Sequence, residues 1–170
     1  VKEPRFLQRV PQRPLHIMTL DEWGPVSPPT YHGGQYALMI YDLYTQYAWC
    51  AILNRFTEFL PTLQRFIAHS EAHHNRDLIT MHKSCSSRPA IKIGFIRMDL
   101  LRSHTDKRVQ DYLKDRGTMP EWVGPGRSSH YQNALAESAM YPNNRNTIAM
   151  METGNAPKVF WGDAWVHSVM

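Results

Sequence analysis

The order of hydrophobic patterns along the chain is the feature that most limits its fold. Three apolar extended runs come first, at residues 15–23, 36–43 and 47–53. A helical pattern follows at 56–70, where apolar side chains recur at spacings of three and four. A fourth apolar run, 91–98, comes after it. The second and third runs predict a hairpin, and a parallel pairing of the first run with the fourth requires the crossover that the helix provides.

The last third of the chain is predicted to be mainly helical. Thr105 can cap a short helix that Gly117 ends. A further helix is expected to carry Glu137. Trp161 and Trp165 lie four residues apart near the end, a spacing that should dock a final helix onto the core.

The composition is that of one compact globular domain. The chain has 170 residues, of which 42% are hydrophobic and 20% are charged. Nineteen Lys and Arg against fifteen Asp and Glu give a net charge of +4, a mild basic excess that suits a phosphate-bearing partner without specifying one. Cys50 and Cys85 fit no zinc spacing, and we expect no disulfide framework. No apolar run approaches the length needed to cross a bilayer, so no membrane partner is expected.

Two aspartates accompany apolar strands, where an unpaired carboxylate is costly. Asp21 lies within the first run, and Asp99 ends the fourth. The predicted topology puts them on neighbouring strands of one sheet, and Glu137 would reach them from a covering helix. Carboxylate oxygens are the ligands that hard cations such as Mg²⁺ prefer. Two such ions, roughly 4 Å apart, stabilise both the attacking and the leaving oxygen of a phosphodiester transfer.

A histidine cluster is the other candidate for metal binding. His69, His73 and His74 lie on the predicted long helix, and the spacing from His69 to His73 could hold a metal on one face. No carboxylate motif of the metalloprotease kind accompanies them. We therefore favour an exposed histidine patch over a metal site.

Five segments, taken in order, resemble the catalytic cores of Ty1/copia-type retrotransposon integrases. They cover most of the chain from about Leu15 onward, and their agreement in order is more specific than any one motif. They are LDEWGPVSPPTYHGGQYALMIYDLYTQYAW, the helical stretch that includes FIAHSEAHHN, IRMDLLRSHTDKRVQDYLKDRG, YQNALAES and VFWGDAW.

The resemblance implies an α/β, RNase H-like fold: a mixed five-stranded sheet with helices on both faces. It implies metal-dependent DNA 3′-end processing and strand transfer, with Mg²⁺ or Mn²⁺ as the cofactor. Catalysis and metal binding are carried over to Asp21, Asp99 and Glu137. Residues 1–14 would be a linker from an upstream region, and residues 15–170 the core, ending within its last helix.

The resemblance also implies the partners. These are DNA, as element ends and as target, and further copies of the chain, because two DNA ends must be joined together. A nuclear location, reached by way of a cytoplasmic particle, goes with this function. Four side chains before Glu137 could contact DNA, at backbone phosphates rather than base edges, with simple surface solvation an equal alternative. They are Arg127, His130, Gln132 and Asn133.

Three departures from the family pattern support an alternative function. Leu100 and Leu101 stand where the family usually has Asn-Gly, and Ser138 where a basic residue is common. Pro142 would cost a continuing helix about 3 kcal/mol or kink it one turn after Glu137. The alternative is a catalytically inactive, decayed or domesticated domain that binds nucleic acid or protein. A third possibility is an RNase H-fold nuclease acting on another nucleic acid.

Overall fold

The computed structural model describes residues 9–81, 90–101, 104–123 and 127–169, with the side chains of 77–81, 127–137 and 139 excepted. Its centre is a five-stranded sheet in the order β3-β2-β1-β4-β5. The first three strands pair antiparallel, whereas β4 runs parallel to β1 and β5 parallel to β4. The strands are β1 (Ile17–Trp23), β2 (Tyr36–Asp42), β3 (Ala48–Leu53), β4 (Phe95–Asp99) and β5 (Met119–Val123).

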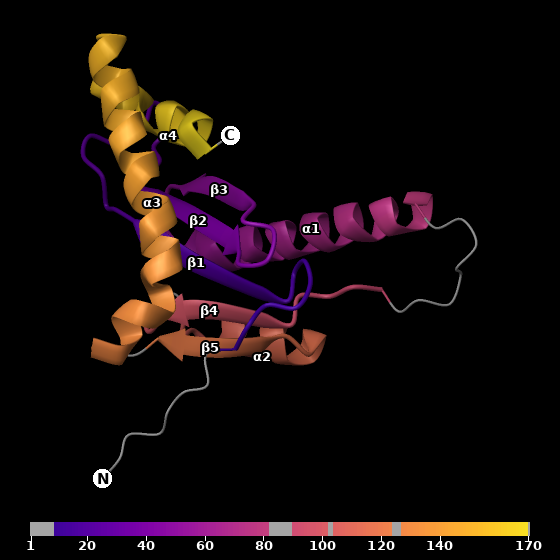
Figure 1. Cartoon of the computed structure of the whole chain (residues 1–170). Helices are drawn as coiled ribbons and strands as arrows, with labels where there is room; N and C mark the ends of the chain where they lie inside the picture. The colour runs from indigo at the N-terminus through magenta and orange to yellow at the C-terminus, as the bar shows by residue number, and fades with distance from the viewer. Residues whose placement is uncertain (1–8, 82–89, 102–103, 124–126, 170) are drawn as a thin grey trace.

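Helices cover both faces of this sheet, as Figure 1 shows. One face carries α1 and α2, and the other carries α3 and α4. The four helices are α1 (Phe59–Met81), α2 (Lys107–Arg116), α3 (Arg127–Thr153) and α4 (Trp161–Val169), and short 3-10 turns at Phe56–Glu58 and Lys158–Phe160 lead into α1 and α4. The predicted mixed α/β architecture, with its parallel crossover from β1 through α1 to β4, is confirmed.

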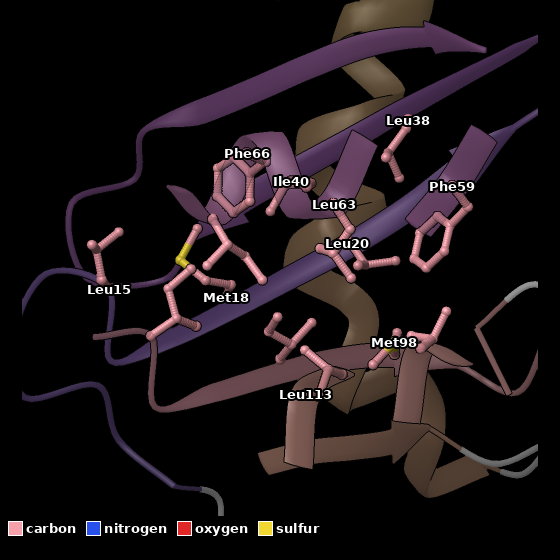
Figure 2. Packing of buried hydrophobic residues seen from close by; sticks show 14 of the residues in the cluster. Leu15, Met18, Leu20, Leu38, Ile40, Phe59, Leu63, Phe66, Met98 and Leu113 are labelled. Carbon is pink, nitrogen blue, oxygen red and sulfur yellow. The ribbon is translucent and has the colours of Figure 1, made fainter. Parts of the chain in front are cut away.

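The larger core lies between the sheet and helices α1 and α2 (Figure 2). Alternate residues of β1, β2 and β4 point into it, which is the period-two pattern of a strand with one covered face. Helix α1 supplies its apolar side chains at spacings of three and four, as the sequence predicts. The members labelled in Figure 2 are Leu15, Met18, Leu20, Leu38, Ile40, Phe59, Leu63, Phe66, Met98 and Leu113.

A second, smaller core attaches α3 and α4 to the opposite face. Ala37 and Met39 of β2 pack there with Met140 of α3 and with both tryptophans of α4. Trp161 and Trp165 are buried, so the prediction that they dock the final helix is confirmed.

Several local predictions need correction. Thr105 does not cap α2: its hydroxyl donates to the Leu101 carbonyl, and Asp106 is the N-cap, accepting from the Arg108 amide at 2.8 Å. Gly117 ends the helix in the left-handed conformation as expected, with φ 73°. The fourth strand begins at Phe95 rather than at residue 91.

The element pattern along the chain also missed β5 (Met119–Val123), although the family resemblance implied a fifth strand. Pro120 lies inside this strand and weakens its signal. The sheet tolerates the proline because β5 is an edge strand. Pro142 lies inside α3, which continues through it to Thr153.

Within the portion of the chain that the structure describes, no helix is both long enough and apolar enough to cross a membrane.

Candidate functional site

Asp21 and Asp99 occupy equivalent positions on adjacent parallel strands. The recorded pairs between β1 and β4 run from Ile17–Phe95 to Thr19–Arg97. Asp21 and Asp99 each lie two residues beyond the last pair, at the carboxyl end of the parallel ladder. In open α/β sheets this edge, between neighbouring strands, is where ligands bind. Both aspartates are half-buried, so neither residue is enclosed by the core or fully exposed to solvent.

The two aspartates also share a face of the sheet. Asp21 pairs with Met39 across β1 and β2, and paired residues of antiparallel strands point the same way. Met39 belongs to the core under α3 and α4, so Asp21 points to that face. Met98 is buried in the opposite core, and alternation along β4 therefore directs Asp99 to the α3 face as well. The sequence-based prediction of neighbouring strands is thus extended to a common face.

Helix α3 crosses this same face and carries Glu137. It contacts β1, β2, β4 and β5, and Figure 1 shows it running across the strands. Glu137 lies in the helical backbone, but its side chain is outside the described part of the structure. The convergence of Glu137 with the two aspartates therefore stays a prediction.

A buried polar pair that sequence reasoning missed lies next to the two aspartates. Glu22 follows Asp21 and points to the α1 face, because its partner Leu38 belongs to that core. Its Oε1 lies 3.1 Å from Nε2 of His104, and the two side chains are 4% and 1% exposed. The Nδ1 of His104 lies 2.9 Å from the carbonyl oxygen of Asp99. A sequence signal was present in the histidine five residues after Asp99, but nothing local linked it to Glu22.

An ion pair between Arg97 and Glu121 connects β4 to β5 on the α3 face, two residues before Asp99. Arg97 is buried and donates to Glu121 at 2.9 Å and 3.2 Å, and the two residues are direct partners in the strand register. Arg9 also donates to Glu121 at 3.1 Å, and its guanidinium lies over the Phe95 ring, 3.7 Å from the centroid. Residues near the start of the described chain therefore pack against β4 and β5.

The histidine cluster lies elsewhere. His69, His73 and His74 line a hollow between α1 and the β2–β3 hairpin, on the opposite face from Asp21 and Asp99. His69 and His73 are exposed, and their ring centroids are 6.2 Å apart. Among the described residues, no group of three or more His, Cys, Asp or Glu side chains could hold a metal ion. The histidine cluster is among these described residues, whereas the Glu137 side chain is not.

The four predicted DNA contacts fall in the first two turns of α3. Their backbone is helical, but their side chains are outside what the structure describes, and the prediction stays untested for Arg127, His130, Gln132 and Asn133.

Comparison with solved structures agrees with this fold. A chain from a cryo-EM structure of a simian T-cell lymphotropic virus intasome, solved in complex with the PP2A regulatory subunit B56 gamma, is similar with a TM-score of 0.66 and 15% sequence identity. The likeness covers 99% of this chain and 51% of that chain, so the present chain spans about half the length of its structural relative. At this identity the likeness shows an integrase-like, RNase H-like fold. No protein-family model matches the sequence.

Proposed function

We propose that this chain is the catalytic core of a Ty1/copia-type retrotransposon integrase. In this proposal it performs metal-dependent 3′-end processing and strand transfer of DNA. The observation that carries the proposal is the placement of Asp21 and Asp99 at one level, on one face and on adjacent parallel strands. The strand spacing of about 4.8 Å brings two carboxylates within reach of a shared ion.

Helix α3 supports the third position. Met39, the partner of Asp21 on β2, packs in the same core as Met140 of α3. The helix therefore crosses the sheet next to the Asp21 level. Glu137 precedes Met140 by three residues, a spacing that puts two positions on neighbouring parts of one helix surface. This makes α3 suitable to bring Glu137 to the pair of aspartates.

The donor set fits Mg²⁺ or Mn²⁺, because hard divalent ions prefer carboxylate oxygens. When bound, such ions supply Lewis-acid stabilisation of the charge that develops on the attacking and leaving oxygens. The protein would hold these ions through Asp21, Asp99 and Glu137 and leave positions for water and phosphate. The nucleophile is water when an end is trimmed and the freed 3′-hydroxyl when it is joined to target DNA.

The remaining parts of the proposal concern the partners. Arg127, His130, Gln132 and Asn133 would bind phosphates of the DNA at the start of α3, a favourable end for anions. Self-association into at least a dimer would bring two DNA ends together, and the reaction would take place in the nucleus.

A strand-transfer assay tests the catalytic proposal. The full chain is incubated with a duplex oligonucleotide bearing a recessed 3′-hydroxyl, a supercoiled target and either Mg²⁺ or Mn²⁺. We expect joined product from the parent and from Asp111→Asn, an exposed aspartate of α2 that serves as the matched control. Asp99→Asn, which keeps the side-chain size but removes the charge, should reduce product to background. A parent that binds DNA but joins none with either metal overturns the enzymatic proposal and supports the binding-domain alternative.

A further inference from the structure

A chain of three polar groups connects the strand that carries Asp21 to the residue Asp99. Glu22 on β1 contacts His104, and His104 contacts the main chain of Asp99. Glu22 and His104 are 82 residues apart in sequence, so the link is made by the fold alone. The Glu22 amide, in addition, donates to the Asp21 carboxylate at 2.9 Å. Each aspartate is therefore one hydrogen bond away from this pair.

The direction of each bond follows from the chemistry of the groups. The Asp99 carbonyl can only accept, so Nδ1 of His104 carries a proton and donates it. The 3.1 Å contact between Nε2 and the Glu22 carboxyl needs one further proton, on either atom. In both arrangements the pair has no net charge, and both ring nitrogens of His104 are occupied. The imidazole therefore fixes a distance between β1 and the end of β4.

The surroundings keep this link rigid. The Phe59 ring packs on His104 with centroids 4.6 Å apart, and both side chains are buried. The second oxygen of Glu22 is buried without a hydrogen-bond partner among the described residues, so His104 is the contact that compensates this carboxyl. A buried polar group with one partner has little freedom to reorient, because moving it leaves the group unsatisfied.

Leu100 and Leu101, the two described residues directly after Asp99, provide no comparable apolar anchor. Leu100 and Leu101 are 52% and 41% exposed, so burial of these side chains does not hold the segment in place. Instead, the Asp99 carbonyl accepts from the Leu101 amide at 2.8 Å as well as from His104. Asp99 also pairs with Val123 at the end of the β4–β5 ladder, so the polar link is a second constraint on its backbone and the one that connects it to Glu22 of β1.

From these contacts we infer that Glu22 and His104 are positioning residues, which set the distance between Asp21 and Asp99 and so the affinity of the site for divalent cations. The inference rests on the proposed function, because it assumes that the two aspartates bind metal. Loss of groups that orient metal ligands lowers metal affinity by about 10- to 100-fold. Neither Glu22 nor His104 is proposed as a metal ligand.

The test measures Mn²⁺ binding directly, by isothermal titration calorimetry and by electron paramagnetic resonance of the free ion. The principal variant is Glu22→Leu with His104→Phe, which replaces a buried polar pair by apolar side chains, an exchange that often preserves or raises stability. We expect this variant to unfold at the same urea concentration as the parent or a higher one. Its dissociation constant for Mn²⁺ should rise about 10-fold or more.

Two single variants separate positioning from other roles. Glu22→Gln keeps the contact, since its amide can donate to a neutral His104 that still donates to Asp99, and should bind Mn²⁺ within about two-fold of the parent. His104→Gln keeps a donor for Glu22 but cannot also reach the Asp99 carbonyl, and should bind more weakly. It also replaces the double variant as the decisive measurement if that variant does not fold.

The outcomes distinguish this inference from the proposed function. If the parent binds Mn²⁺ and Asp99→Asn does not, while both pair-breaking variants bind like the parent, the positioning role is wrong and the metal site stands. If Glu22→Gln weakens binding as much as Asp99→Asn does, Glu22 acts through its charge and the inference is overturned. A parent that binds no Mn²⁺ overturns both.

Discussion

The contact of α4 with the sheet allows a prediction in which two physical effects have opposite signs. Gly162 lies in the first turn of α4, and replacing a helical glycine by alanine ordinarily stabilises a protein by up to about 1 kcal/mol. At this position a Cβ atom would lie 2.5 Å from the Cγ2 methyl of Thr30. Carbon atoms in contact prefer 3.5–4.0 Å, so the overlap is about 1 Å.

Thr30 has little room to relieve this overlap. Its side chain is branched at Cβ, and its hydroxyl accepts from the Gly34 amide at 2.7 Å, so rotation would break that buried hydrogen bond. Overpacking of a tight contact costs about 1–3 kcal/mol. We therefore expect Gly162→Ala to destabilise the protein by up to roughly 2 kcal/mol after the full helical gain is subtracted.

Urea denaturation of a double-mutant cycle measures this effect. Thr30→Ser removes the methyl but keeps the hydroxyl that accepts from the Gly34 amide. In the parent it should lower the free energy of unfolding, because a buried methyl is lost, whereas in the Gly162→Ala background it should lower it little, because the overlap is relieved. The coupling free energy between the two sites is expected to be about 1–3 kcal/mol. Gly117→Ala is the contrasting control: nothing lies within 4 Å of its Cβ, so any loss there comes from the positive φ of 73° alone. A coupling below about 0.5 kcal/mol, or a Gly162→Ala variant more stable than the parent, would refute the steric argument.

Three further predictions concern the thiol, a helix cap and the second core. Burial raises the pKa of Cys50 to about 11, so in a Cys85→Ser variant the Cys50 thiol should react with Ellman's reagent at pH 8 far more slowly than free cysteine. A rate equal to that of free cysteine would contradict the burial of this thiol. Hydrogen bonds from Arg108 lower the pKa of Asp106 from 3.8 to about 2, so this carboxylate should stabilise the folded state fully above pH 4 and lose its contribution as the pH falls through 2. Asp106→Ala should therefore lower the urea midpoint at pH 7 and change it little at pH 2. An equal loss at both pH values would refute a cap that acts through its charge. Trp165 is fully buried and its Nε1 donates to Asn144 at 2.8 Å, so Trp165→Ala should lower the free energy of unfolding, measured by chemical denaturation, by about 3–5 kcal/mol. Phe160→Ala, at a 43% exposed position, should lower it by less than about 1 kcal/mol.

The sequence predicts much of this fold because most of its strands and helices have a recognisable local hydrophobic pattern. The apolar alternation of β1 and β2 and the helical spacing in α1 are set by which side chains must be buried, and burial is visible as a period. The local pattern does not predict β5, because this edge strand contains Pro120, has a short apolar pattern and is stabilised mainly by pairing with β4. The sequence pattern predicts the N-cap of α2 one residue too early, because Thr105 and Asp106 are both good cap residues and only the contacts with Arg108 select Asp106.

The candidate site divides in the same way. Asp21 and Asp99 can be found in the sequence because a carboxylate at an apolar strand is unusual and because strand order follows from the crossover. Glu22 and His104 cannot, since their importance depends on a contact between residues 82 positions apart. The face to which Asp21 points also needs the register of β1 with β2, which no local pattern provides.

The alternation along β1 has a consequence for comparing copies of such a chain. Adjacent residues of one strand serve the two sides of the sheet: Asp21 faces α3, and Glu22 faces the large core. A related chain could therefore keep Asp21, Asp99 and Glu137 and still differ at Phe59 or His104, and a comparison of those three acids alone would not register the difference. On the proposed function, a comparison of related chains should include Glu22 and His104, which contact each other on the opposite side of the sheet, together with the three acids.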